Sequence, residues 1–163
     1  MIKIVSFVLT FIALSVPSLA QTKTPPIQGV WKVVERTSVG PNSGSNRSPE
    51  PGLYIFAATH YSIMSVERPR RASMPAKQPA KLSDAEKIAR YEEWASLIAN
   101  AGNYKIEGGA VILRPSIAKS VAFMEGPGQT YNFKLDGDVL WLTLKTTGKE
   151  ASDSPTIKLQ RLE

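Results

Sequence analysis

Apolar and polar positions alternate along most of the chain, which is the pattern of half-buried β-strands. It is clearest in residues 129–135, where Tyr131, Phe133 and Leu135 share one face. Other β-prone runs are 27–39, 53–58, 61–67, 103–107, 110–114, 138–146 and 155–162. Most of these runs are joined by short turns, of which Asp136-Gly137 is one. The pattern therefore predicts about eight consecutive antiparallel strands.

A helical pattern interrupts the strands midway along the chain. Ser83 and Glu86 have the spacing of a capping box, which marks a helix start. Apolar residues then recur at helical spacing, at Ile88, Tyr91, Ala95 and Ile98. The sequence 100–102, Asn-Ala-Gly, predicts the end of this helix. In the irregular segment 115–127, a short further strand is expected around 121–124.

Consecutive antiparallel strands with one apolar face need that face covered. Closing the sheet on itself covers the face and removes exposed strand edges. The expected fold is therefore mainly β, an up-and-down antiparallel β-barrel of about eight strands with one inserted α-helix. A sandwich of two sheets is the alternative, because its strands show the same alternation.

The first twenty residues have the parts of a secretory signal peptide. Lys3 supplies the positive charge, residues 4–16 are mostly apolar, and 18–20 place small residues at the cleavage positions. The apolar run is shorter than the roughly 20 residues of a membrane-spanning helix, and no cysteine follows it to carry a lipid anchor. We therefore expect cleavage after residue 20. Residues 21–163 would form one exported domain, periplasmic or secreted, without a transmembrane segment.

Composition narrows the class of protein further. Of 163 residues, 42% are hydrophobic and 21% are charged, which argues against a disordered chain. The absence of cysteine excludes a disulfide scaffold and thiolate-ligated metal sites. The single histidine, His60, is expected in a turn and has no nitrogen or sulfur partner for a metal. Phosphate-binding glycine loops, nucleophile elbows and dinucleotide fingerprints are also absent, so no cofactor is expected and no catalytic motif supports an enzyme.

A family resemblance rests on the first and last predicted strands. Gly29-Val30-Trp31 opens the first strand, and Arg161 lies near the end of the last. This pairing resembles the lipocalin pattern, in which an arginine on the last strand covers the tryptophan of a G-x-W motif and closes the barrel floor. Residues 27–162 as a whole resemble the small bacterial lipocalin-like domain proteins. Further matching segments are Gly52-Leu53-Tyr54, Gly102-Asn103-Tyr104 and 136–142.

The resemblance implies that Gly29, Trp31 and Arg161 are structural. It also directs attention to the barrel interior, which is either filled by side chains or able to hold one small ligand. The apolar residues that would line such a cavity, or simply form the core, include Phe56, Met64, Trp94, Tyr131, Phe133 and Leu142.

Charged residues are candidates for the mouth of such a cavity. Alternation from Trp31 through Val33 places Glu35 on the inner face, either as a cavity acid or as an ordinary residue at the rim. Arg70 and Arg71 lie in a basic loop where they would meet an anionic group, although such loops are usually only solvated.

Three functions stay open. The first is an exported, non-catalytic protein that binds a small lipophilic ligand, with or without an anionic group. The second is a filled barrel whose long loops, 40–51 and 68–81, bind another protein of the cell envelope. The third is an enzyme of the isomerase or cyclase kind, with Glu35 and a cavity tyrosine as the candidate groups. Nucleic acid is not an expected partner, because aromatic residues are not interleaved with the basic ones.

Overall fold

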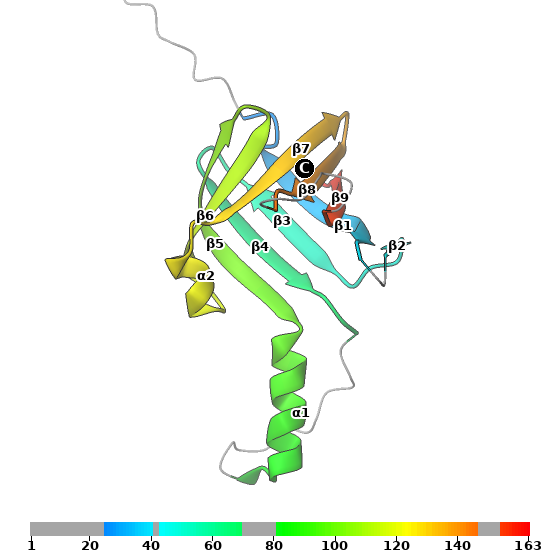
Figure 1. The fold of residues 1–163 in the computed structure, drawn as a ribbon, viewed down its shortest axis with the longest axis vertical. Coiled ribbons are helices and arrows are strands. Elements are labelled where there is room, and N and C mark those ends of the chain that lie inside the picture. Colours follow the sequence, from blue (N-terminus) through cyan, green and yellow to red (C-terminus); the bar gives the residue numbers. More distant parts are fainter. Residues whose placement is uncertain (1–24, 41–42, 70–80, 147–153) are drawn as a thin grey trace, which may run out of the picture.

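The computed structural model describes residues 25–40, 43–69, 81–146 and 154–163. Within them, nine antiparallel strands form one sheet in the order β2-β1-β3-β4-β5-β6-β7-β8-β9. An additional pairing of β1 with β9 closes the sheet into a barrel (Figure 1). The predicted antiparallel barrel is confirmed: eight strands make the closed barrel, and β2 is an extra short strand beside β1.

Local pairing builds most of this barrel, since each strand from β3 to β8 pairs with the next one in sequence. The strands are β1 (Gly29–Ser38), β2 (Gly44–Asn46), β3 (Gly52–Phe56), β4 (His60–Val66), β5 (Leu97–Glu107), β6 (Ala110–Ala118), β7 (Gln129–Asp136), β8 (Val139–Leu144) and β9 (Thr156–Arg161). The helices are α1 (Asp84–Ala95) and α2 (Val121–Glu125). None of the helices in the described part of the chain has the length and apolar character needed to cross a membrane. The predicted signal peptide, residues 1–20, lies outside the described residues.

One end of the barrel is closed by Trp31, which is fully buried. Its indole Nε1 donates a hydrogen bond to the carbonyl of Ile27 at 2.9 Å. The guanidinium carbon of Arg161 lies 4.0 Å from the centre of the Trp31 ring, the geometry of a cation–π contact. The Nη1 of Arg161 also donates to the carbonyl of Gln28 at 2.6 Å. These contacts join the first strand of the barrel to the last.

Gly29 allows this close approach. Its φ of +141° is a conformation that residues with a side chain rarely adopt. A Cβ atom at this position would collide with the guanidinium of Arg161 and the carbonyl of Glu163. A larger residue would therefore strain the backbone and push Arg161 away from the tryptophan.

A bulge in β1 changes which of its residues face the interior. The register between β1 and β9 shifts between Val33 and Glu35, so β1 holds one extra residue there. Beyond the shift, Arg36 lines the interior. Simple alternation predicts Glu35 on the inner face, but the bulge places Arg36 there instead. The carboxylate of Glu35 instead accepts a hydrogen bond from the Ser45 hydroxyl on β2.

Helix α1 begins as predicted but ends earlier. The amide of Glu86 donates to the Ser83 hydroxyl at 3.3 Å, and the amide of Ser83 donates to the Glu86 carboxylate at 2.8 Å, which completes the capping box. The chain leaves the helix at Ser96 and enters β5 at Leu97. The predicted helix end at 100–102 is wrong, because these residues pair with both β4 and β6 and sheet pairing outweighs the local helical pattern.

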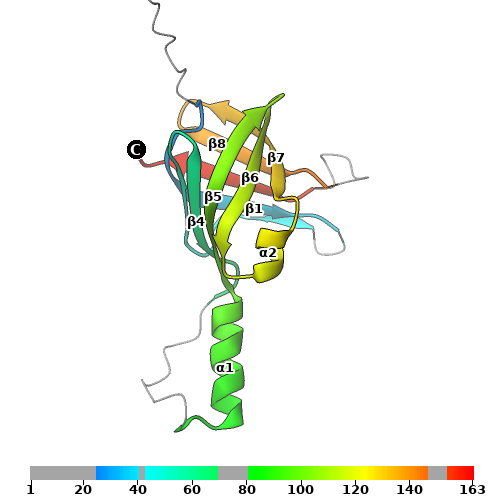
Figure 2. The same ribbon diagram turned by 90° about the vertical axis from the view of Figure 1, so that its left-hand side faces the viewer.

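Helix α1 projects away from the barrel, roughly in line with β5 (Figures 1 and 2). None of its residues is buried. Its last turn carries no basic residue. Lys119, which follows β6, supplies a positive charge at that end of the helix. The Nζ of Lys119 donates to three carbonyl oxygens there, those of Trp94, Ala95 and Leu97, at 2.5, 3.0 and 2.8 Å. A side chain from the barrel therefore caps the helix.

The short strand expected around 121–124 is wrong, because these residues belong to helix α2. The pairing of β6 with β7 covers only Ala110–Leu113 and Gln129–Asn132. Residues 121–125 lie beyond that paired stretch and close on themselves, with the amide of Phe123 donating to the carbonyl of Ser120 at 3.2 Å.

Candidate ligand-binding cavity

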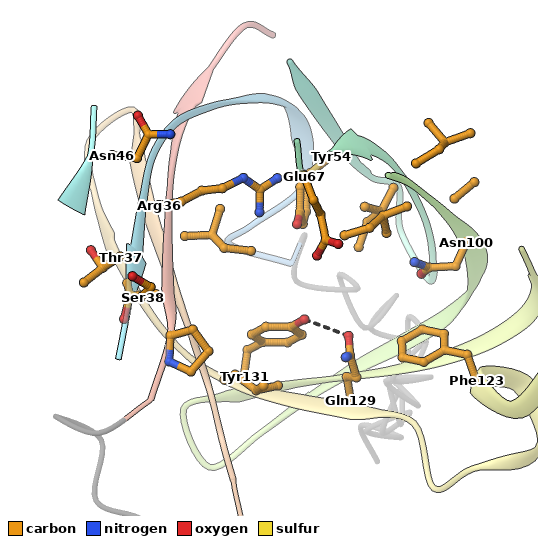
Figure 3. Close-up of a pocket in the computed structure, with 18 of the residues that line it drawn as sticks. Arg36, Thr37, Ser38, Asn46, Tyr54, Glu67, Asn100, Phe123, Gln129 and Tyr131 are labelled. Atoms are coloured by element: carbon orange, nitrogen blue, oxygen red, sulfur yellow. Dashed lines mark hydrogen bonds between the residues drawn. The ribbon is translucent and has the colours of Figure 1, made fainter. Parts of the chain in front are cut away.

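The open end of the barrel holds a cavity of about 810 Å³. Its walls come from strand segments that meet at this end: the last residues of β1, β6 and β8 and the first residues of β5, β7 and β9. Strand β2 and helix α2 add to the rim. The residues labelled in the close-up are Arg36, Thr37, Ser38, Asn46, Tyr54, Glu67, Asn100, Phe123, Gln129 and Tyr131 (Figure 3).

Much of the wall is apolar. Its larger apolar members come from five different elements and are Ile63, Leu97, Ile98, Phe123, Leu144 and Ile157. A concave wall whose accessible surface is mostly apolar is typical of sites that bind small organic molecules. The polar groups of the wall therefore decide which molecule fits.

Arg36 is the central polar group. Its Nη2 donates a hydrogen bond to the hydroxyl of Ser65, which is buried. Its guanidinium also holds the hydroxyl of Tyr54 by a side-chain hydrogen bond. The Nε of Arg36 is buried and has no hydrogen-bond partner among the described residues. A buried donor of a charged group without a partner is costly, so Arg36 has unmet hydrogen-bonding capacity beside the cavity.

Two tyrosines contribute neutral hydroxyls to the wall. Burial raises the pKa of Tyr54, and the positive charge of Arg36 opposes that rise in part. Burial also raises the pKa of Tyr131, whose hydroxyl donates to the Gln129 side-chain oxygen at 2.7 Å (Figure 3). Both hydroxyls therefore keep their protons at neutral pH and act as hydrogen-bonding groups.

Asn100 supplies a second unpaired polar atom across the cavity from Arg36 (Figure 3). Its side-chain oxygen is buried and has no partner among the described residues. Arg36 and Asn100 thus both line the cavity, and each holds a buried polar atom without a partner among the described residues. Glu67, which is exposed, also points into the space between them (Figure 3).

The structure brings only part of the residue set expected from the sequence to this cavity. Tyr131 lines it. Phe56 and Leu142 lie in the filled half of the barrel, where both are buried. The ring of Phe56 packs edge-on against Tyr104, with centroids 5.3 Å apart. Phe133 is half-buried and packs against the same core.

Other expected residues lie elsewhere. Met64 is 57% exposed, because alternation along β4 turns Ile63 inward and Met64 outward. Trp94 is 59% exposed on α1. Arg70 and Arg71 lie outside the described residues.

Four residues of the cavity wall were not expected from the sequence: Arg36, Asn100, Gln129 and Phe123. Arg36 depends on the bulge, and Asn100 falls in the segment expected to end the helix. Tyr54 could have been found, since it alternates with Phe56 on one face of a predicted strand. Gln129 and Phe123 carry no signal in the sequence that singles them out.

A closed eight-stranded antiparallel barrel with a cavity at one end and Trp31 beneath Arg161 at the other defines the lipocalin-like class of proteins. The chain belongs to the family of lipocalin-like domains, whose family model matches residues 28–162. A search of curated proteins and a search of solved structures return no match. The fold of this family points to ligand binding.

Proposed function

We propose that this protein binds one small lipophilic molecule with an anionic or strongly accepting group, and that it does so without converting it chemically. The observation that carries this proposal is Arg36, a charged side chain that lines a cavity with a largely apolar wall. The acceptor group of the ligand would pair with Arg36, and its apolar body would contact Ile63, Leu144 and Ile157. A polar group farther along the ligand would meet Asn100.

The size of the cavity supports this proposal. About 810 Å³ lies within the range of roughly 300–1,000 Å³ that is usual for small-molecule sites. The neutral state of the cavity tyrosines supports binding over proton transfer, because a hydroxyl that keeps its proton is a poor general base.

A binding experiment with paired ligands tests the chemistry. A fluorescent long-chain fatty acid is titrated into the purified protein and compared with its methyl ester. A charge-assisted hydrogen bond is worth about 1.5–3 kcal/mol, so Arg36→Met should weaken binding of the acid about 10- to 100-fold. The ester should bind the wild type and Arg36→Met nearly alike. Equal affinity of the wild type for acid and ester would contradict the role of Arg36.

A second pair of variants tests the location. Ala118 lines the cavity, whereas Met64 points outward. Ala118→Trp should obstruct the cavity and weaken binding at least tenfold, and the matched Met64→Trp should bind like the wild type. Circular dichroism checks that both variants fold. If folded Ala118→Trp binds with unchanged affinity, the ligand lies elsewhere.

We also propose that the protein acts outside the cytoplasm as the processed chain 21–163. The proposal rests on the signal-peptide pattern of residues 1–20. Mass spectrometry of the protein recovered from its host should give the mass of the chain that begins at Gln21. Recovery of the uncut chain from the cytoplasmic fraction would overturn this part of the proposal.

A further inference from the structure

The apolar face of α1 is uncovered. Ile88, Tyr91 and Trp94 recur at helical spacing and are 60%, 71% and 59% exposed. None of them packs into the core, and no residue of the helix is buried. An amphipathic helix in a globular protein normally buries such a face.

A second exposed apolar surface lies on the outside of the barrel. Cross-strand pairing places Leu53 beside Met64 and Ile117 beside Ala101, while Ile55 lies two residues from Leu53 on the same face. We call this surface the outer patch and define it by Leu53, Ile55, Met64 and Ile117. The outward positions between them are Ser62, Ala99 and Ala101, so no charge interrupts the patch.

These two surfaces account for most of the exposed apolar side chains. Apart from Val121 and Leu162, every large hydrophobic residue found exposed in the described ranges belongs to α1 or to the outer patch. Contiguous apolar surface of this kind usually marks a site of interaction.

The charges around the two surfaces are complementary. Helix α1 carries four acidic and two basic residues, whereas the whole chain has a net charge of +6. Two basic residues border the outer patch. Lys32 of β1 pairs with Leu53, and Arg114 precedes Ile117 on β6. An acidic helix with an apolar face therefore matches an apolar patch with a basic border. An anionic membrane would instead be repelled by the polar face of α1.

The dimensions also match. A helix of 12 residues is about 18 Å long, and the outer patch crosses the strands from β3 to β6, a width of about 14 Å at the usual strand spacing. In one chain, α1 extends beyond the end of the barrel (Figures 1 and 2). A second copy placed antiparallel about a two-fold axis brings each helix alongside the barrel of the other.

We propose that two copies of this chain form a symmetric dimer in which α1 of each copy packs across the outer patch of the other. The contact is made twice, so the apolar area removed from water is doubled. Lys119 supports this arrangement, because it ties the end of α1 to the barrel and holds the helix extended.

Sedimentation equilibrium of the purified protein tests the dimer. The wild type should have twice the chain mass. Tyr91→Glu on α1 and Met64→Glu on the outer patch should each raise the dimer dissociation constant at least tenfold. Both side chains are exposed, so neither change threatens the fold. Leu162→Glu, at an exposed apolar residue outside both surfaces, is the matched control and should leave the dimer intact. A monomeric wild type at 100 µM would overturn the proposal.

Disulfide trapping tests which surfaces meet. Because the chain contains no cysteine, every crosslink comes from the introduced residues. Tyr91→Cys protein is mixed with Leu53→Cys, Met64→Cys or Ile117→Cys protein and then oxidised. At least one mixture should give a covalent dimer of the two different variants. Efficient crosslinking of Tyr91→Cys to itself alone would show that the helices pair with each other, which overturns the proposed contact. Binding of a monomer to anionic phospholipid vesicles, abolished by Tyr91→Glu, would overturn it in favour of a membrane.

Discussion

Tyr61 lies on the inner side of β4, and its hydroxyl has no hydrogen-bond partner among the described residues. Burial raises the pKa of this hydroxyl to about 12 from its usual value of 10.0. The folded protein therefore holds the proton more tightly than the unfolded chain does. Burial raises the pKa of Tyr131 in the same direction.

This difference predicts a loss of stability in alkali. Below pH 10.0 the hydroxyl is protonated in both states, so it contributes no pH dependence. Between pH 10.0 and about 12 the unfolded chain binds fewer protons, and the free energy of unfolding should fall as pH rises. Tyr61→Phe should reduce that fall. Urea denaturation from pH 8 upward measures it, and an unchanged slope in the variant would contradict the assignment.

Residue-scale features also explain what the sequence could reveal of the site. Alternation identified Tyr131 as inward-facing, and it lines the cavity. It could not identify Arg36, because one extra residue in β1 reverses the alternation beyond Val33. Such a bulge depends on pairing with β9, which lies more than a hundred residues away in the sequence.

At the scale of elements, α1 depends on a residue outside itself. Its start is secured by its own Ser83 and Glu86, and its end by Lys119 of the barrel. The helix makes few other contacts with the barrel. Its last turn should therefore be sensitive to a change that lies far away in the sequence.

Lys119→Met should loosen the last turn of α1, because three carbonyl oxygens lose a charged donor. Hydrogen exchange followed by mass spectrometry should show amides near Trp94–Leu97 exchanging about tenfold faster, while those of β6 to β8 stay unchanged. Lys105→Met, which removes another exposed lysine, is the control. Equal exchange in both variants would show that Lys119 does not hold the helix.

The strands were predictable because most pair with their sequence neighbours across short turns. In such hairpins, local alternation and turn residues already specify the partner. The end of α1 was not predictable, since residues 97–102 fit a helical pattern and become a strand only through β4 and β6. Residues 121–124 were misassigned for the opposite reason, because they lie beyond the stretch in which β6 pairs with β7.

At the scale of the whole molecule, the barrel has a filled half and an open half. Trp31, Phe56 and Leu142 pack in the filled half, whereas Leu144, two residues after Leu142 on the same face, lines the cavity. Alternation tells which face a residue occupies but says nothing about its depth along the barrel axis. This is why Phe56, Phe133 and Leu142 could not be separated from the cavity wall by sequence.

The difference between the filled and the open half predicts that the same leucine-to-alanine substitution lowers the free energy of unfolding by different amounts. Leu142→Ala should lower the free energy of unfolding by about 3 kcal/mol, because it opens a cavity in packed core. Leu144→Ala should cost about 1 kcal/mol, because its side chain already borders open space. Urea denaturation of both variants gives the comparison. Equal losses would show that the two halves are packed alike.

The contact between Trp31 and Arg161 has a consequence for the evolution of this protein's sequence. Closure of the barrel is secured by Trp31 and Arg161 at one end and by backbone pairing of β1 with β9 toward the other, so it does not depend on the side chains that line the cavity. Replacements among the wall residues can therefore accumulate without unfolding the chain, and new ligands can be selected on an unchanged foundation. The barrel is a scaffold whose evolvable surface is on the inside.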